Sequence, residues 1–242
     1  DRCQTVFNGV DSQDFINSDR IHKNKQKIIY VGRISPEKGI HTLLDAFAIV
    51  KDKYPSAQLE IIGPQKPTPT EFLASLSDDP KVANLAKFAP ENYFRDLLKK
   101  LPIKNSSVCF IGSIKHLELV DRYREAAILI NPSLSEAFGM SLVEAMSTAI
   151  PTIATNIGGM TEIVEDSKTG LLVEADEPEL LAEAMIKLLA DDELRKSMGE
   201  LGRQKVLEYY NRQKVTENLL YQYSQLICDR ELITMNQALL VN

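Results

Sequence analysis

The sequence predicts an α/β protein built on a doubly wound, Rossmann-like parallel sheet. Short apolar segments rich in β-branched residues, such as 27–32 (KIIYVG) and 127–133 (AILINPS), alternate with segments such as 41–55, where apolar residues recur at helical spacing. This alternation indicates βαβ units, whose helices cover both faces of a parallel sheet. Ligands of such sheets bind at the carboxyl ends of the strands, in the loops that lead into the helices.

The other elements follow the same rhythm. Strands are predicted at 57–63, 107–114, 150–156 and 170–175, and helices at 116–126, 140–148, 158–166 and 178–192. We therefore place one Rossmann-like domain at 25–192, with a lead-in at 1–24 and C-terminal helices and a tail at 193–242. The proline-rich start of 64–105 breaks the rhythm, which predicts an inserted surface segment with helices of its own.

Composition excludes several classes of protein. The 242 residues carry a formal net charge of −6, with 44% hydrophobic and 26% charged residues, and the pI is near 5.3. These values are typical of a globular chain and argue against general binding of nucleic acid or of an anionic membrane. Cys3, Cys109 and Cys228 lack the spacing of a metal site or a disulfide framework. Because DRCQTVFNGV also lacks the form of a signal peptide, we expect a cytoplasmic location.

Residues 138–141 (FGMS) stand where the strand at 127–133 leads into a helix. A glycine in such a turn lets the backbone approach a ligand, and the free amides of a first helical turn attract an anion such as phosphate. The backbone around Gly139 is therefore a candidate phosphate site. These residues alone leave open the alternative that Gly139 only fits the turn and that Ser141 caps the helix.

Two cations follow the first strand, within 32–39 (GRISPEKG). Arg33 offers a planar fork for phosphate oxygens and Lys38 a mobile point charge, which together suit a diphosphate. Surface cations are common, so either side chain could instead be solvated. Their place on the predicted ligand edge favours the functional interpretation.

Two carboxylates flank the glycine turn. Glu144 lies about one turn inside the following helix, where it could accept hydrogen bonds from the vicinal hydroxyls of a ribose. Glu136 precedes the turn and could reach another polyol. A diphosphate between two sugars, which is a nucleotide sugar, needs both the anion site and the carboxylates. The alternative is that both glutamates simply favour a helix N-terminus.

These segments together resemble a known family. GRISPEKG, FIG at 110–112, NPSLSEAFGMSLVEAM at 131–146 and PTIATNIGGMTEIVEDSKTGLLV at 151–173 are similar, in the same order, to the donor-binding half of retaining glycosyltransferases with the GT-B fold (family 4). FNGVDSQDF at 7–15 resembles the segment that ends the first GT-B domain. The resemblance implies that the acceptor-side domain, the first half of such an enzyme, is missing from this chain.

The resemblance implies roles for single residues. Arg33 and Lys38 would hold the diphosphate and stabilise charge on the leaving phosphate, Glu136 would contact the transferred sugar near its anomeric carbon, and Glu144 would bind the ribose. Amides at 139–141 would complete the diphosphate cradle, and Ile114 would lie against the base. The implied catalytic residues are Arg33, Lys38 and Glu136. The implied donor-binding residues are Gly32, Arg33, Lys38, Ile114, Glu136, Phe138, Gly139, Met140, Ser141 and Glu144.

Such enzymes transfer a hexose from a nucleotide diphosphate sugar, here with UDP favoured, to a glycan or other hydroxyl, and they need no metal or other cofactor. The expected mechanism is front-face attack assisted by the leaving phosphate. No D-x-D sequence lies on the site edge, and the aspartates at 78–79 and 191–192 are interpreted as turn and helix-cap carboxylates.

Two other functions were weighed against this one. The first is a non-catalytic nucleotide-sugar-binding subunit whose partner supplies the acceptor site, and the sequence leaves it open. The second is a nicotinamide-dependent oxidoreductase, which is disfavoured because no G-x-G-x-x-G follows the first strand.

The remaining candidates have structural interpretations. Gly158 and Gly159 suit a turn with positive φ, and His41 and His116 are expected to be partly exposed residues at helix starts rather than catalytic bases. We expect His22, in the basic run 22–27, to be solvated. Four tyrosines are expected to pack the C-terminal helices: Tyr209, Tyr210, Tyr221 and Tyr223. Because the final helix of GT-B proteins often crosses back to the first domain, 213–242 is expected to fit a surface outside this chain.

Overall fold

A computed structural model describes residues 5–11, 15, 24–66, 69, 79–101 and 107–239, without the side chains of residue 90 and of 228–239. Within it, six parallel strands form one sheet in the order β3-β2-β1-β4-β5-β6, which confirms the predicted doubly wound α/β class. The strands are β1 (Lys27–Val31), β2 (Gln58–Ile62), β3 (Val108–Gly112), β4 (Ile128–Asn131), β5 (Thr152–Thr155) and β6 (Gly170–Val173). Cys3, His22 and Asp78 lie outside the described residues.

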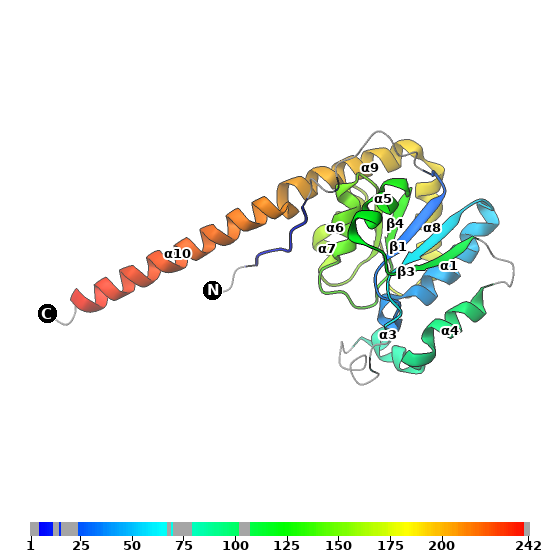
Figure 1. Ribbon diagram of the computed structural model, residues 1–242, viewed down its shortest axis with the longest axis horizontal. Coiled ribbons are helices and arrows are strands. Elements are labelled where there is room, and N and C mark those ends of the chain that lie inside the picture. Colours follow the sequence, from blue (N-terminus) through cyan, green and yellow to red (C-terminus); the bar gives the residue numbers. More distant parts are fainter. Residues whose placement is uncertain are drawn as a thin grey trace.

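Helices alternate with the strands, as the sequence predicts (Figure 1). The longer ones are α1 (Ile40–Lys53), α4 (Pro90–Lys100), α5 (His116–Glu125), α6 (Met140–Ser147), α8 (Pro178–Ala190), α9 (Asp192–Lys205) and α10 (Arg212–Leu239). The short ones are η1 (Pro36–Lys38), α3 (Pro80–Ala83), η2 (Asn84–Lys87), α7 (Met160–Ile163) and the π-helical turn η3 (Val206–Tyr210). None of the helices in the described part of the chain is both long and apolar enough to cross a bilayer.

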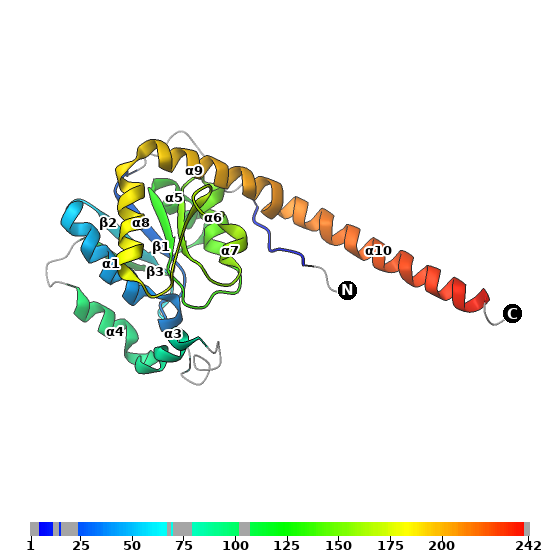
Figure 2. The same cartoon turned by 180° about the vertical axis from the view of Figure 1, so that it is seen from behind.

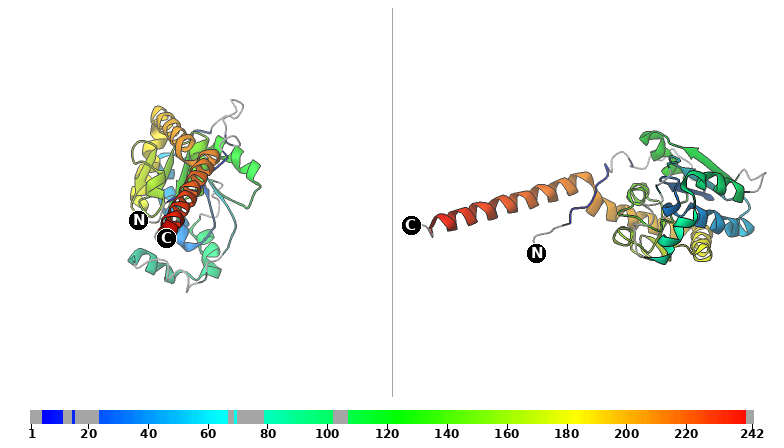
Figure 3. Two further views of the ribbon diagram at one scale, coloured as in Figure 1. Left: turned by 90° about the vertical axis from the view of Figure 1, so that its left-hand side faces the viewer. Right: turned by 90° about the horizontal axis from the view of Figure 1, so that it is seen from below.

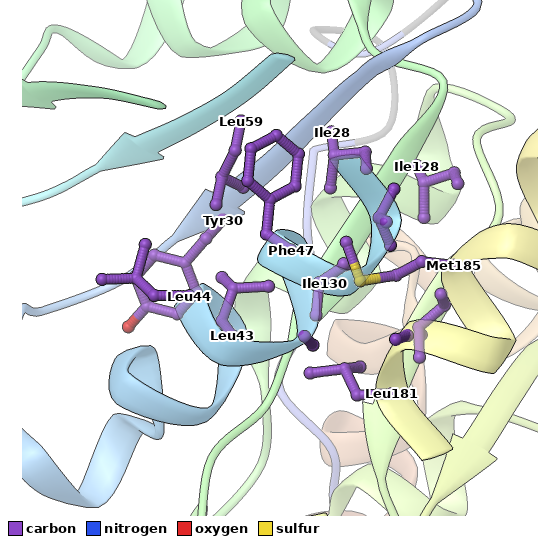
Figure 4. Close-up of a cluster of buried hydrophobic side chains, with 14 of the residues drawn as sticks. Ile28, Tyr30, Leu43, Leu44, Phe47, Leu59, Ile128, Ile130, Leu181 and Met185 are labelled. Atoms are coloured by element: carbon purple, nitrogen blue, oxygen red, sulfur yellow. The ribbon is translucent and has the colours of Figure 1, made fainter. Parts of the chain in front are cut away.

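Helices cover the sheet on both faces. Helices α1 and α8 lie side by side over one face (Figure 2), and Figure 4 shows Phe47 of α1 and Met185 of α8 packed against Ile28 and Ile130 of the strands. Helices α5, α6 and α7 contribute to a second apolar cluster, with Ile29, on the other face. Residues on both sides of β1 are therefore buried, which explains why KIIYV is apolar throughout instead of alternating.

The inserted segment carries helices, as predicted, and α4 packs against α1. Aromatic rings of the inserted segment enclose His41, which is 6% exposed. The Phe88 ring centroid lies 4.6 Å from that of His41, and Tyr93 Oη lies 2.9 Å from His41 Nδ1. The prediction of a partly exposed His41 is therefore wrong, because a segment distant in sequence covers the start of α1. His116, by contrast, is exposed at the start of α5, as predicted.

His41 also joins the start of α1 to the loop that follows β6. Its Nε2 lies 3.6 Å from Asp176 Oδ1, which in addition accepts a hydrogen bond of 2.8 Å from Thr42 Oγ1. His41 and then Thr42 hold the pKa of Asp176 at about 2, below its ordinary value. The contacts tie α1 to the β6 side of the sheet, so we assign His41 a structural role.

The C-terminal helix leaves the body of the protein. In Figure 1 and Figure 3, α10 extends away from the sheet and its helices, and residues 5–11 lie beside its first turns. Tyr210 is 2% exposed, whereas Tyr209, Tyr221 and Tyr223 are 53%, 59% and 55% exposed. The prediction that all four tyrosines pack the C-terminal helices is therefore wrong for these three. Tyr209 lies in η3 with its side chain exposed, and Tyr221 and Tyr223 lie on α10, which has no neighbour among the described residues along most of its length.

Close backbone contact joins the loops at the carboxyl edge of the sheet. The chain leaves β1 toward α1 on one face and leaves β4 toward α6 on the other, so the order of strands reverses between them and leaves a crevice. Gly39, in the loop after β1, has φ +67°, and a Cβ there would lie 2.0 Å from the carbonyl oxygen of Pro132 in the loop after β4. Only glycine satisfies both constraints.

Gly39→Ala should lower the free energy of unfolding more than Gly112→Ala does, as measured by urea denaturation. Both residues have positive φ, +67° and +78°, so alanine carries a backbone cost of about 1–2 kcal/mol at either site. Only at Gly39 does the new methyl group also meet backbone, whereas no described atom lies within 4 Å at Gly112. Equal losses for the two variants would contradict the close contact with Pro132.

Candidate functional site

The loops after β1 and β4 are bonded to each other across the crevice. The carbonyl oxygen of Glu37 accepts the Leu134 amide at 2.8 Å and the Ser135 amide at 3.4 Å. Together with the approach of Gly39 to Pro132, these bonds fix the relative position of residues 32–39 and 132–139. The crevice is where ligands of doubly wound sheets bind, so its side chains form the candidate site.

Lys38 and Glu136 meet directly in this crevice. Lys38 Nζ lies 2.9 Å from Glu136 Oε2 and 3.5 Å from the Ser135 carbonyl oxygen, and the two side chains are only 15% and 19% exposed. The sequence assigned the cation to phosphate and the carboxylate to hydroxyls, as separate groups. The structure brings them together as a partly buried ion pair, and a ligand of either group must compete with the other.

Arg33 is paired as well, with a residue that the sequence analysis missed. Its guanidinium lies 3.1 Å from Glu37 Oε1, which also accepts a 2.6 Å hydrogen bond from Ser35 Oγ. Glu37 is 3% exposed, whereas the Arg33 side chain is 47% exposed and faces solvent. Tyr30 Oη donates to the Arg33 carbonyl oxygen at 2.7 Å. The sequence could have indicated Glu37 by its place four residues after Arg33, a spacing at which oppositely charged side chains often pair.

Gly139 is the N-cap of α6, with φ +102°. No side chain among the described residues caps the helix, so the alternative in which Ser141 is the cap does not hold. The positive φ does require glycine, which agrees with the part of that alternative in which Gly139 fits the turn. Met140 and Ser141 are the first two residues of α6, where backbone amides of a helix point outward and attract anions.

The loop after β5 supports this turn by backbone contact. Gly158 has φ +49°, as predicted, and a Cβ there would lie 2.2 Å from the Glu136 carbonyl oxygen. The prediction of positive φ is wrong for Gly159, whose φ is −66° because it already has helical backbone at the N-cap of α7. A Cβ at Gly159 would lie 2.4 Å from the Ala137 carbonyl oxygen. Larger residues at either position would push the loop that carries Glu136 out of place, so this glycine pair positions the site.

Glu144, on α6, is bonded to a buried tyrosine of α5. Tyr123 Oη donates to Glu144 Oε2 at 2.7 Å, and Tyr123 is fully buried. Burial raises the pKa of Glu144 above its ordinary value, while the Tyr123 hydrogen bond and the nearby His116 oppose the shift. The sequence analysis missed Tyr123. Its hydroxyl fixes one carboxylate oxygen, so the other is the one that a ligand hydroxyl would reach.

The other predicted residues occupy the same edge of the sheet. Gly32 directly follows β1, and Ile114, half-buried, lies between β3 and α5. Phe138 differs from these two residues, because its ring packs against Phe7 and Tyr210.

Among the described residues, no three His, Cys, Asp or Glu side chains are grouped to hold a metal ion. Asp79 and Asp191 cap α3 and α9, as predicted for these carboxylates.

Comparison with known proteins identifies the family. Residues 11–205 match the family described as "Glycosyl transferases group 1". The chain belongs to this family. Among its relatives is the D-inositol 3-phosphate glycosyltransferase of Corynebacterium urealyticum, with 30% identity over 219 residues, which cover 86% of this chain and 48% of that protein. The chain therefore spans about half the length of this glycosyltransferase.

Solved structures of GT-B glycosyltransferases share the fold. Sucrose-phosphate synthase from Thermosynechococcus elongatus superposes with a TM-score of 0.74 and 26% identity, over 93% of this chain and 52% of that one. HepE from Anabaena, solved in complex with UDP-glucose, gives a TM-score of 0.73 and 20% identity, over 92% of this chain and 57% of that one. At that identity the second similarity establishes the fold alone.

Tyr123→Phe should destabilise this glycosyltransferase chain by about 1–3 kcal/mol at neutral pH, because the buried Glu144 carboxylate loses its hydrogen-bond donor. The pKa of Glu144, already raised in the folded state, rises further. The folded chain then binds the proton more tightly than the unfolded chain, and stability is regained as pH falls through the folded pKa. The measurement is urea denaturation at neutral and mildly acidic pH.

Tyr223→Phe is the matched control, since the Tyr223 ring is 55% exposed on α10. It should change neither the stability nor its pH dependence. If the loss of unfolding free energy in Tyr123→Phe were the same at acidic pH as at neutral pH, the Tyr123 hydroxyl would not act through Glu144.

Proposed function

We propose that this chain is the donor-binding half of a retaining glycosyltransferase, which holds a nucleotide diphosphate sugar in the crevice between the loops after β1 and β4. UDP is the favoured nucleotide. The enzyme transfers the hexose to a hydroxyl of a glycan or another acceptor, which a separate acceptor domain would bind. The observation that carries the proposal is the contact between Lys38 and Glu136, because a lysine suits a phosphate and a carboxylate suits sugar hydroxyls.

The paired charges explain how an anion could enter a site that holds two carboxylates. Arg33 with Glu37 and Lys38 with Glu136 form two ion pairs, so the four side chains carry no net charge without a ligand. A diphosphate brings negative charge to the two cations and to the first amides of α6. Lys38 would turn from Glu136 toward the phosphate, and Glu136 would be released to accept hydrogen bonds from the sugar.

The same rearrangement suits transfer with retention. As the bond between the anomeric carbon and the phosphate breaks, negative charge grows on the leaving oxygen, where Arg33 and Lys38 stabilise it. In front-face attack the leaving phosphate accepts the proton of the acceptor hydroxyl, so the protein needs no general base of its own. Glu136 would hold the sugar hydroxyls near the anomeric carbon. We propose no metal or other cofactor in these steps.

One comparison supports the choice of ligand and another the existence of a separate acceptor domain. HepE, which has the same fold, was solved with UDP-glucose, and the related D-inositol 3-phosphate glycosyltransferase extends over about twice the matched length. We infer that the partner of this half is an N-terminal acceptor domain, and we expect neither nucleic acid nor membrane to bind it. A cytoplasmic location stays a prediction. The alternative function, a nucleotide-sugar-binding subunit without catalysis, shares the site and differs only in lacking transfer when the acceptor half is supplied.

UDP should protect this chain against thermal unfolding, since a ligand that binds only the folded state stabilises it by about 2.7 kcal/mol at a hundred times its Kd. Arg33→Ala should weaken UDP binding by about 1.5–3 kcal/mol, the range for charge-assisted hydrogen bonds. Thermal shift and titration calorimetry measure the two effects.

Arg95→Ala is the matched control, because Arg95 is an exposed arginine that bonds Asn92 within α4. It should bind UDP as the unchanged chain does. No protection by UDP, GDP or ADP would contradict the proposed function, and equal affinities of the Arg33 and Arg95 variants would contradict the diphosphate assignment.

Glu136→Gln should affect binding of the diphosphate and handling of the sugar in opposite directions. The substitution removes the carboxylate that pairs with Lys38 and frees the cation, so UDP without a sugar should bind about twofold to fivefold more tightly. Transfer from the UDP-sugar, assayed with the acceptor half supplied, should fall because the sugar loses its carboxylate. Weaker binding of UDP by Glu136→Gln would show that Glu136 supports the diphosphate site instead of competing for Lys38.

A further inference from the structure

Three aromatic rings meet behind the turn that begins α6. The Phe7 ring centroid lies 5.3 Å from that of Tyr210 and 6.3 Å from that of Phe138, and the centroids of Phe138 and Tyr210 are 5.9 Å apart. These separations are those of interacting aromatic side chains, and the two pairs with Tyr210 are edge-on. We call Phe7, Phe138 and Tyr210 the aromatic trio.

The trio joins three parts of the chain that are distant in sequence. Phe7 lies in the segment that enters the domain, and Phe138 lies in the loop after β4. Tyr210 is the last residue of η3, where the chain leaves the domain before α10 begins. The entering and leaving segments are also bonded through their backbones. The Val10 amide donates to the Tyr210 carbonyl oxygen at 2.9 Å, and the Arg212 amide donates to the Val10 carbonyl oxygen at 2.8 Å.

Tyr210 is the fixed member of the trio. It is 2% exposed, and its hydroxyl donates to the Glu162 carbonyl oxygen at 3.1 Å, on α7. Phe7 is thereby held against a rigid surface on one side and against Phe138 on the other. Displacement of Phe7 would leave Tyr210 as the one ring of the trio that still packs against Phe138.

Phe138 is bonded covalently to Gly139, the residue whose backbone sets the direction of the first α6 amides. Gly139 has φ +102° and lacks a side chain of its own, so packing of the adjacent residue restricts the turn. The Phe138 ring is the large apolar group next to this glycine. Fixing the ring fixes the turn, and an anion site that is held in place before binding costs less entropy to occupy.

We infer that Phe7 is a positioning residue for the diphosphate site, and that it acts through Phe138 on the Gly139 turn. Phe7 is not among the predicted donor-binding residues, and its described ring contacts are with Phe138 and Tyr210. The segment that connects this half to the rest of the protein is thus part of the site that binds the nucleotide. The inference rests on the proposed function, because it concerns the same diphosphate.

The test compares UDP with uridine on the full chain, since only UDP reaches the turn with a diphosphate. Phe7→Ala should weaken UDP binding by about tenfold, the loss expected when an oriented set of charge-assisted bonds is disturbed. It should leave uridine binding unchanged within about twofold. Titration calorimetry serves for UDP and ligand-observed NMR for uridine. A purely structural role would weaken both ligands alike.

Two further variants keep the result interpretable. Phe94→Ala truncates a ring of similar packing, 5.0 Å from Phe110 and remote from the trio, and should reduce stability without changing either affinity. Phe7→Leu keeps an apolar contact with Phe138 and should show the same selectivity for UDP with a smaller loss. If Phe7→Ala does not fold, the leucine variant carries the test.

The outcomes distinguish the inference from the function on which it rests. An unchanged chain that binds neither UDP nor uridine overturns the proposed function and the inference with it. An unchanged chain that binds UDP, with a Phe7 variant of equal affinity, overturns only the inference. A Phe7 variant that loses UDP and uridine in the same proportion also overturns the inference, because the effect is then general.

Discussion

The candidate site depends on the contact between the loops that follow β1 and β4. Ligands of doubly wound sheets bind where parallel strands send their helices to opposite faces, and here backbone contacts join the two loops at that point. Gly39 approaches the Pro132 carbonyl, and the Glu37 carbonyl accepts two amides of the opposite loop. The side chains that a ligand would meet stand on this backbone frame, so their spacing follows from a constraint that does not itself involve the ligand.

Within that frame the charges neutralise one another. A cation that is four-fifths buried loses hydration and needs a partner, and for Lys38 that partner is Glu136. The pairing gives each of these partly buried side chains an opposite charge at 2.9 Å. Glu37 has a structural role. Its buried carboxylate contacts both Ser35 and Arg33, and its carbonyl oxygen accepts the hydrogen bonds that join the two loops. Structure and site chemistry share the same residues.

The aromatic trio extends this frame to the ends of the domain. Phe138 precedes Gly139, the N-cap of α6, and its neighbours Phe7 and Tyr210 belong to the segments through which the chain enters and leaves. The contacts of the trio hold the entering and leaving segments in a fixed position beside the start of α6. Edge-on ring contacts and two backbone bonds at Val10 provide that here, where α10 then departs from the body.

The sequence by itself determined the fold class, because strand and helix periods and the turn glycines are local properties, and the order of its motifs indicated the family that the comparison then showed. It placed Arg33, Lys38 and Glu136 at one edge of the sheet without showing which carboxylate each cation meets. Only the tertiary structure decided those pairings, the burial of His41 beneath the inserted helix, and the contact of Phe7 with Phe138. The reason is that such contacts join segments far apart in the chain, whose approach depends on how helices pack and not on any local period.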